Sequence, residues 1–316
     1  MAKRLGPRRG SRAFRPRKRA EKLNVRINAV PKVDEVRMLN FLGFKVGMSQ
    51  VSFVETRESP EKGTEVVKAV TLVEVPKSIC YGIRFFKNKQ VVEDLLVNDE
   101  KILKELGIKK VKNVDAPKEF DEVRLLAYSV VKDTKIGQKK SIVYEILLGG
   151  NDAKKQYEYA KNFLGKEIKI NDVFKKGEHI DVVGVTKGKG WQGVIKRFGI
   201  AKQRRKATGK VRHLGTLGPW HPAYVMYTVP MAGQTGFHKR TEQNKLLLEI
   251  VNDKNEIIKV KPFHKYGLIR NDFVVLEGSI QGPPKRLVKL KLSNRNANAK
   301  DLVQLIEKNY LHVQNT

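Results

Sequence analysis

The most distinctive chemistry of this sequence lies in a sixty-residue run, Val182–Thr241, that contains no Asp or Glu. The run holds twelve Lys or Arg and ten Gly, whereas 33 acidic residues in 316 predict about six in a window of this length. A segment without carboxylates suits a surface that must lie against negative charge, and a phosphate backbone is the commonest such partner. The run therefore predicts binding to a polyanion.

The run opens with a glycine- and lysine-rich segment, GVTKGKGWQG, that starts at Gly184. Glycine lets the backbone approach a phosphate closely and turn its N–H groups outward, while Lys187 and Lys189 add positive charge. A mononucleotide-binding loop would need four residues between its first Gly and the Gly-Lys pair, followed by Ser or Thr. Only three residues separate Gly184 from that pair, and a glycine follows the lysine, so this segment does not match such a loop.

A basic cluster follows, with no carboxylate close enough in sequence to pair with its cations. The cluster comprises Lys202, Arg204, Arg205, Lys206, Lys210 and Arg212. The planar guanidinium of Arg makes bidentate contacts to phosphate and stacks on unpaired bases. A merely solvated face is the alternative, and the lack of nearby acids favours phosphate contacts. The same role is predicted for the other cations of the run, Lys187, Lys189, Lys196, Arg197, Lys239 and Arg240.

The run then changes character at the sequence LGTLGPWHPAY. Pro219 and Pro222 fix the backbone on either side of Trp220, and Gly218 permits a tight turn just before it. One interpretation of Trp220 is that it packs into the core, as a single Trp usually does. The other is a rigid tip that stacks among nucleotides, as aromatic residues do in RNA recognition. The candidate tip residues are Gly218, Pro219, Trp220, His221 and Pro222.

The N-terminal residues 1–36 form a second basic segment, which we call the arm. Residues 1–20 carry nine Lys or Arg and no acid, and several Gly and Pro residues interrupt any helix. A disordered tail or a sorting signal is the alternative to an arm that becomes ordered on phosphates. Because the chain has a second basic segment, we predict RNA binding by Arg8, Arg9, Arg12, Arg15, Arg17, Lys18 and Arg19.

The composition describes a nearly ordinary globular body with two cationic extensions. The chain has 64 Lys or Arg against 33 Asp or Glu, a net charge of +31, and residues 1–20 and 182–241 supply 21 of these charges. A polyanion is required to neutralise such a charge. The single Cys80 excludes an intramolecular disulfide, and no apolar run reaches the length of a membrane span. We predict a cytosolic protein with a nucleic-acid partner and no membrane partner.

The residue pattern gives little support to catalysis. Hydrolysis of a phosphodiester needs carboxylates to hold a metal or to act as a general base, and the basic run has none. The six histidines form no i,i+4 pair, and no Cys accompanies His213 and His221. The sequence therefore predicts no catalytic residue, metal, cofactor or small-molecule substrate. Two other classes stay open, an RNA-modifying enzyme and a DNA-compacting architectural protein.

The elements that must position these residues are mainly short strands. Strands are predicted at Met38–Val46, Val51–Glu55, Val66–Val75, Ile79–Phe86, Val123–Val131, Ser141–Leu148, Lys245–Val251, Ile257–Val260, Phe273–Glu277 and Arg286–Leu292. Helices are predicted at Asp99–Leu106, Asp152–Phe163 and Asn298–Lys308. Many short strands with few helices favour a closed or nearly closed barrel over a parallel sheet. The basic run is then a long excursion from a β body, and loops of that length are seldom without function.

Five segments resemble, in order, the universal large-subunit ribosomal protein three family. They read LGFKVGMS, GVTKGKGWQGVIKRFG, LGTLGPWHPAYV, VPMAGQTGFHKRTEQN and LEGSIQGPPKRLVKL. The basic arm and the length of 316 residues are similar to archaeal and eukaryotic members rather than to the shorter bacterial ones. The similarity spans nearly the whole chain, and its central motifs are highly specific.

This resemblance implies a mainly β fold with an α/β insertion, built as a six-stranded translation-protein-type barrel with two long basic extensions. The implied parts are the arm at 1–36, barrel strands at 37–98, the α/β insertion at 99–166, further barrel strands at 167–297 and a C-terminal helix at 298–316. The second barrel part contains the run 182–241, which we call the finger loop.

The resemblance also implies a structural protein of the large ribosomal subunit in the cytoplasm. Its implied partners are large-subunit rRNA and neighbouring ribosomal proteins, and family members help to begin subunit assembly. In the family, a finger carrying a Trp reaches towards the peptidyl-transferase centre and the path by which aminoacyl-tRNA arrives. Trp220 matches that Trp, and Gly218, His221 and Pro222 match its surroundings.

Overall fold

The chain divides into two compact units. The computed structural model describes residues 14–27, 29, 31–108, 116–117, 119–207, 211–252, 254–295, 301 and 303–310. One unit, the body, comprises Leu23–Gly184 and Arg240–Thr316, and the other, the basic unit, comprises Met1–Lys22 and Val185–Lys239. The basic unit thus joins the start of the arm with most of the finger loop.

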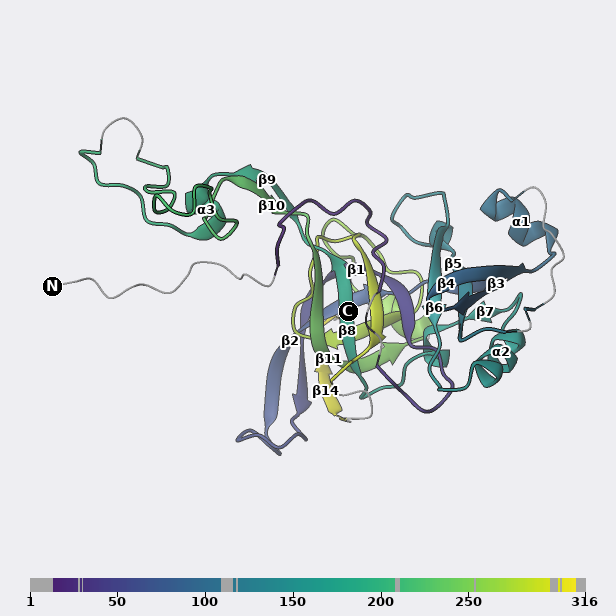
Figure 1. Ribbon diagram of the computed structural model, residues 1–316. Coiled ribbons are helices and arrows are strands. Elements are labelled where there is room, and N and C mark those ends of the chain that lie inside the picture. Colours follow the sequence, from purple (N-terminus) through teal and green to yellow (C-terminus); the bar gives the residue numbers. More distant parts are fainter. Residues whose placement is uncertain are drawn as a thin grey trace. The chain divides into compact units, whose positions relative to one another are not determined.

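The larger sheet of the body contains seven strands (Figure 1). They are β1 (Asn40–Val54), β2 (Glu65–Glu74), β8 (His179–Val185), β11 (Lys239–Val251), β12 (Phe273–Glu277), β13 (Leu287–Leu292) and β14 (Gln304–Lys308). Their order is β13-β8-β11-β12-β2-β1-β14, and β13 also pairs with β1. The pairings therefore lead from β1 through β2, β12, β11, β8 and β13 back to β1.

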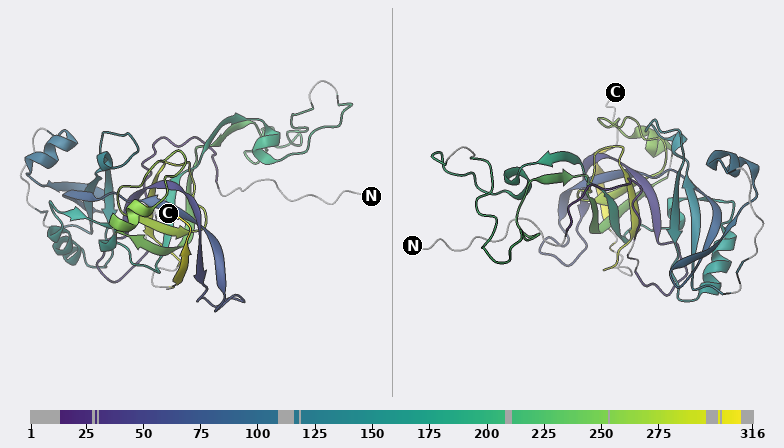
Figure 2. Two further views of the ribbon diagram at one scale, coloured as in Figure 1. Left: turned by 180° about the vertical axis from the view of Figure 1, so that it is seen from behind. Right: turned by 45° about the horizontal axis from the view of Figure 1, so that its top comes forward.

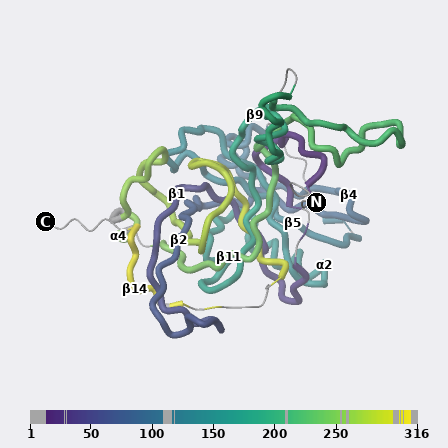
Figure 3. The backbone as a smooth tube through the Cα atoms, turned by 90° about the vertical axis from the view of Figure 1, so that its left-hand side faces the viewer, coloured from purple at the N-terminus to yellow at the C-terminus, as the bar shows by residue number. Residues whose placement is uncertain are grey.

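Strand β1 organises this sheet because it pairs with three others. Its first half pairs with β13, from Asn40 opposite Lys291 to Phe44 opposite Leu287. Its second half pairs with β14, and nearly its whole length pairs antiparallel with β2. The β1–β2 hairpin is the long purple-to-blue pair of strands in Figure 2, and β14 runs beside it in the tube view of Figure 3.

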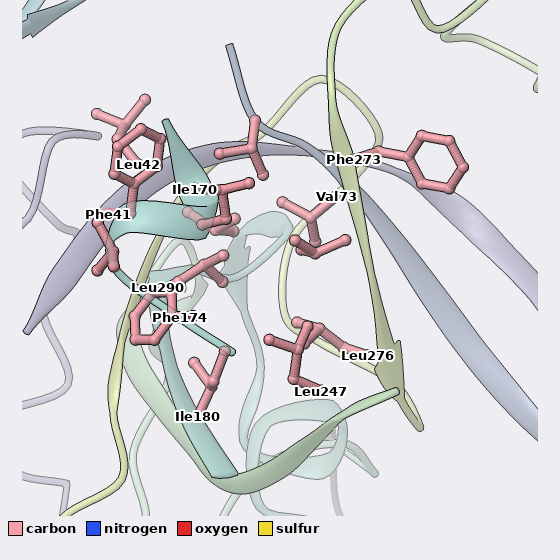
Figure 4. Packing of buried hydrophobic residues seen from close by; sticks show 14 of the residues in the cluster. Phe41, Leu42, Val73, Ile170, Phe174, Ile180, Leu247, Phe273, Leu276 and Leu290 are labelled. Carbon is pink, nitrogen blue, oxygen red and sulfur yellow. The ribbon is translucent and has the colours of Figure 1, made fainter. Parts of the chain in front are cut away.

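The body encloses one large apolar core, and its members come from every strand of this cycle. Figure 4 shows Val73, Ile180, Leu247, Leu276 and Leu290, from five different strands, meeting in one cluster. Each of these five side chains is fully buried. Such burial accounts for the Val-, Leu- and Phe-rich strands of the sequence, because each apolar side chain removed from water contributes about 1.5–3 kcal/mol.

A second sheet of the body has the order β4-β3-β5-β6, with β7 paired to β3. Its strands are β3 (Ser78–Lys87), β4 (Gln90–Leu96), β5 (Glu122–Ser129), β6 (Ile142–Leu147) and β7 (Glu167–Ile168). Helix α2 (Ala153–Asn162) packs on it through Tyr157, whose ring centroid lies 5.5 Å from that of Phe85. Buried Asn40 links the two sheets, since its side chain donates to Glu145 O at 3.0 Å and accepts from Leu147 N at 2.7 Å.

Short helical segments complete the body. They are α1 (Glu100–Leu106), α4 (Lys254–Lys259) and the one-turn 3-10 helices η1 (Val131–Asp133) and η2 (Ile170–Asp172). Helix α1 begins where the Asp99 side chain accepts a hydrogen bond from the N–H of Lys101. It ends at Gly107, whose φ of 73° is the left-handed conformation that favours glycine.

The basic unit contains a two-stranded ribbon and one short helix. Strands β9 (Gly188–Gln192) and β10 (Gly233–Gly236) pair antiparallel, with Trp191 opposite Gln234. Helix α3 (Val194–Phe198) follows β9 directly and ends at Gly199, which has a φ of 66°. The residues between α3 and β10 form turns and bends in the part of the chain that the structure describes.

Most predicted strands and the first two helices are present. The predicted strands Met38–Val46 and Val51–Glu55 are, however, one strand, β1, because the segment between them also pairs with β2. Strand β11 begins at Lys239 rather than at Lys245. Two further predicted elements are wrong. Residues 257–259 lie in helix α4 rather than in a strand, because Lys and Glu favour a helix enough to offset two adjacent β-branched residues. The predicted C-terminal helix is replaced by strand β14, because Gln304–Lys308 pairs with the second half of β1. Tertiary pairing here overrides local helix propensity.

The predicted division of the body also differs from its sheets. Strands β3 and β4 were assigned to the first barrel part, within 37–98, yet they pair with β5 and with each other. The second sheet therefore begins at Ser78 rather than after residue 98. The sequence pattern did not separate them because strands of both sheets are equally rich in Val, Ile and Phe.

Several cations of the body lie against carboxylates. Where the loop of the β1–β2 hairpin begins, Arg57 contacts Glu55 at 2.7 Å and Glu277 at 2.9 Å, and Lys68 contacts Glu55 at 2.6 Å. The Glu55 side chain is only 2% exposed. The hydrogen bond from Arg57 is the main cause that lowers the pKa of Glu55 to about 2, and the bond from Lys68 adds to it.

We predict that Glu55→Gln lowers the free energy of unfolding at neutral pH by about 2–3 kcal/mol, because it removes the buried one of the two carboxylates, Glu55 and Glu277, that Arg57 and Lys68 share. The pKa of Glu55 lies below the usual 4.5, so its stabilisation is complete above pH 4.5 and is lost as the pH falls towards 2. Urea unfolding at several pH values would measure this. Glu58→Gln, at an exposed position of the same hairpin, is the matched control, and an equal effect of both variants would contradict the prediction.

Candidate nucleic-acid interface

The basic unit has almost no negative charge of its own. Its sequence contains 21 Lys or Arg and a single carboxylate, Glu21, so it carries +20 of the net charge of +31. Glu21 is highly exposed and its nearest cation is Lys18, at 3.8 Å. The positive charge of this unit is therefore compensated very little from within.

The glycine-rich start of the finger loop brings two backbone segments very close together. Gly236 faces the loop, and a Cβ atom at this position would lie 2.1 Å from Lys187 O. Gly236 has a φ of 70° and Gly190 a φ of 64°, so both also need the left-handed conformation. This path leaves the side chains of Lys187 and Lys189 exposed.

The middle of the finger loop presents its cations to solvent. The exposed members are Lys196, Lys202, Arg204, Arg205, Lys206 and Arg212. The two limbs of this segment are joined by the hydrogen bond from Gln203 N to Val211 O at 2.9 Å. This array of exposed cations can contact phosphates without first breaking ion pairs.

Four predicted binding residues lie outside the described residues: Arg8, Arg9, Arg12 and Lys210. At the end of the finger loop, Lys239 is exposed and Arg240, the first body residue after it, is half-buried. Burial lowers the pKa of both groups. They are thus partly withdrawn from water, unlike the cations in the middle of the loop.

The candidate tip is fully open to solvent. Trp220 is 87% exposed, and Gly218, Pro219, His221 and Pro222 are all exposed as well. Gly218 has a φ of 152°, and nothing lies within 4 Å of where its Cβ would be. Trp220 therefore does not pack into the core, and its role as a rigid tip stays a prediction.

Three further aromatic side chains of the finger loop are exposed and were not predicted as site residues. Trp191 on β9 is 76% exposed, Tyr224 is 71% exposed and Tyr227 is 73% exposed. Exposed aromatic rings in a cationic surface are suited to stack on unpaired bases. The signal available in the sequence was the presence of both Trp residues of the chain inside the carboxylate-free run.

Residues 14–20 of the arm lie along the finger loop rather than apart from it. Ala20 N donates to Phe237 O at 2.8 Å, and the Nδ1 atom of His238 lies 2.9 Å from Lys18 O. The Arg15 guanidinium donates to Tyr227 O at 2.7 Å. Of the other predicted arm residues, Arg17 is half-buried, whereas Lys18 and Arg19 are exposed. The two basic segments predicted separately from the sequence thus form one surface.

Arg197 holds the base of this surface together. Its guanidinium donates to Met231 O at 2.9 Å and to Gln234 O at 3.1 Å, which ties α3 to the β10 limb. Burial, and then the nearby charge of Arg15, lower the pKa of Arg197. These acceptors are carbonyl oxygens, so the hydrogen bonds orient Arg197 but leave its charge uncompensated.

Among the described residues, no group of three or more His, Cys, Asp or Glu could hold a metal ion. The thiol of Cys80 is buried, and desolvation raises its pKa to about 12, which keeps it protonated. Within the same described part, no helix is long and apolar enough to span a membrane. What the surface offers is cationic and aromatic contact area.

Comparisons with known proteins place these features in a family. A family model described as Ribosomal protein L3 matches residues 1–99 and 97–315. The large ribosomal subunit protein uL3 of Methanosphaera stadtmanae is 40% identical over 318 residues, covering 94% of both chains. The uL3 proteins of Methanocaldococcus jannaschii and Methanobrevibacter smithii are 41% identical over 308 residues and 38% over 326. These alignments cover 92% and 96% of this chain, and 91% and 97% of the relatives.

The exposure of the two Trp residues leads to a stability prediction. Trp220→Ala and Trp191→Ala should each change the free energy of unfolding by less than about 0.5 kcal/mol, because neither ring leaves water on folding. Phe198→Ala is the matched control: this side chain of the same unit is 6% exposed, and its truncation should cost about 3 kcal/mol. Limited proteolysis across a urea series would compare the variants. Loss of protection by Trp220→Ala equal to that by Phe198→Ala would contradict the exposed placement.

Proposed function

The chain belongs to the ribosomal protein L3 family, and we propose that it is a structural constituent of the large ribosomal subunit that binds large-subunit rRNA through its basic unit. The observation that carries the proposal is the charge of this unit, +20 with one carboxylate. Neutralisation by phosphates releases counterions and gives a strong, sequence-independent contribution to binding. The family comprises ribosomal proteins rather than enzymes, in keeping with a surface of cations and aromatic rings.

The exposed aromatic residues favour RNA with unpaired bases over duplex DNA. Bases of a duplex are stacked on one another and offer their edges, whereas loops and bulges of rRNA offer base faces. Trp191, Trp220, Tyr224 and Tyr227 provide four exposed rings within one cationic unit. A DNA-compacting protein needs the charge but gains nothing from these rings. An RNA-modifying enzyme needs clustered acids or thiols, whereas this unit has one carboxylate and no Cys.

The finger loop has a more specific proposed place. By similarity to the family, its tip at Trp220 extends towards the peptidyl-transferase centre and the path by which aminoacyl-tRNA arrives. The exposed, Pro-flanked Trp220 supports a contact made through an aromatic face. The body then serves as the anchor, and we interpret its cycle of strand pairings as the six-stranded translation-protein-type barrel. Neighbouring ribosomal proteins and early subunit assembly belong to the same proposal.

The salt dependence of binding tests the electrostatic part. If the basic unit neutralises six to ten phosphates, affinity for large-subunit rRNA should fall by about three to five decades between about 50 and 200 mM salt. A filter-binding titration at several salt concentrations measures this slope. Replacing Lys202 and Arg212 by Gln should lower the slope, whereas replacing the exposed body residues Lys62 and Lys101 by Gln should leave it unchanged. Affinity that does not depend on salt would contradict the proposal.

A variant of the tip tests the finger. Trp220→Ala should assemble into large subunits, because the ring supports neither the body nor the base of the finger loop. Subunits carrying it should bind aminoacyl-tRNA more weakly by about 1–3 kcal/mol, the contribution of one aromatic stack. Sedimentation through a high-salt cushion reports assembly, and tRNA filter binding reports the affinity. Trp191→Ala is the control with an equally exposed ring, and equal tRNA defects in both variants would argue against a special role of the tip.

A further inference from the structure

Three guanidinium groups of the basic unit surround one phenyl ring. The Cζ atoms of Arg17, Arg197 and Arg15 lie 4.5, 5.3 and 5.6 Å from the ring centroid of Phe198. Arg15 and Arg17 belong to the arm, whereas Arg197 and Phe198 belong to helix α3 of the finger loop. The cluster therefore exists only where the two basic segments meet.

Burial, and then the charge of Arg15, lower the pKa of Arg197, so the proximity of these two cations is electrostatically unfavourable unless an anion is present. Because all three groups lie within 5.6 Å of one point, their separations are comparable to the Debye length, about 8 Å at physiological ionic strength. Salt therefore screens their repulsion only in part. The ring of Phe198 attracts cations through its face, but a cation–π contact of about 0.5–2 kcal/mol does not neutralise charge. All three Arg side chains are half-buried, so each still has contact with solvent.

We propose that Arg15, Arg17 and Arg197 form one binding site for a phosphodiester group of RNA, completed only when the arm lies on the finger loop. The proposal rests on rRNA binding by the basic unit and assigns a defined place and ligand group within it. A guanidinium has five N–H donors, and the carbonyl oxygens of Gln234, Met231 and Arg17 accept three from Arg197. Arg197 therefore retains N–H donors for a phosphate contact. Phosphate binding at this site then orders the arm.

A neighbouring aromatic ring favours a nucleotide over an acidic peptide as the ligand. The Cζ atom of Arg15 lies 5.9 Å from the ring centroid of Tyr227, which is 73% exposed. Arg15 thus contacts both the Phe198 ring and an open ring on which an unpaired base can stack. A site with a phosphate position and a base position side by side matches the two parts of a nucleotide.

A double-variant cycle on the full-length chain tests the site, with oligouridine as the probe. Arg15→Gln and Arg197→Gln should each lower affinity about tenfold and reduce the salt slope by about one, as expected for one lost phosphate contact. The double variant should lose little more than either single variant, because both residues act on one phosphate. Arg212→Gln, at an exposed position elsewhere in the finger loop, is the control and should combine additively with Arg15→Gln.

A second variant displaces the Arg197 guanidinium without removing its charge. It therefore tests whether affinity depends on the position of this group as well as on its charge. A Cβ atom on Gly233 would lie 2.8 Å from Nη1 of Arg197, so Gly233→Ala should displace this flexible guanidinium without unfolding the ribbon. It should lower affinity about as much as Arg197→Gln, by about tenfold, with the circular dichroism spectrum and thermal unfolding unchanged.

Three outcomes would overturn the inference: additive losses in the Arg15 and Arg197 cycle, full affinity in Gly233→Ala, or non-additive coupling seen with poly-glutamate but not with oligouridine. The last would assign the cluster to an acidic protein partner. Failure of the proposed function looks different, because the wild-type chain itself would then bind oligouridine weakly and without salt dependence. Salt-dependent wild-type binding together with coupled Arg15 and Arg197 variants would support the site.

Discussion

Several guanidinium groups of the body lie against carboxylates, whereas Arg197 of the basic unit lies against carbonyl oxygens and an aromatic ring. Arg57 illustrates the first case, with Glu55 and Glu277, and Arg84 does so with Asp94 and Glu145. Arg197 illustrates the second, with Met231 O, Gln234 O and the Phe198 ring. Ion pairs within the body therefore compensate much of its positive charge. In the basic unit, hydrogen bonds to carbonyl oxygens orient Arg197 but do not neutralise its positive charge. A partner can neutralise that charge.

The sequence patterns correctly predicted those helices and strands whose ends are fixed by residues close in sequence. Helix α1 has both an N-cap in Asp99 and a glycine C-cap in Gly107, and its predicted range was nearly correct. Strand β12 was predicted with the bounds that it has, because Phe273–Glu277 is a buried apolar run. Strand β14 was missed since a helix and an edge strand are both compatible with its sequence. Only the open side of β1, far away in sequence, selects the strand.

The same distinction applies to the candidate interface. Charge segregation is a property of the sequence, so the cations of the finger loop were found from composition alone. The contact between the arm and the finger loop was not predicted from composition, because two cationic segments are expected to repel one another. What joins them is specific and short-range: a hydrogen bond from Ala20 N to Phe237 O, and the ring of Phe198 shared by Arg15 and Arg17. Neither contact has a signature in a linear pattern.

The small apolar core of the basic unit explains why this unit gains stability from a polyanionic partner. Its buried apolar side chains in the described part of the chain are Val185, Val194 and Phe198, a very small core beside that of the body. Ordering a long segment costs conformational entropy at every residue, and so small a core offsets little of it. A partner outside the chain can therefore add substantially to the stability of this unit. Phosphates can supply it, since each one both satisfies guanidinium donors and removes the repulsion that opposes compaction. Because the finger loop has no carboxylates, its cations form no ion pairs with acids of their own segment. Phosphates of RNA can therefore take the place that carboxylates would otherwise occupy.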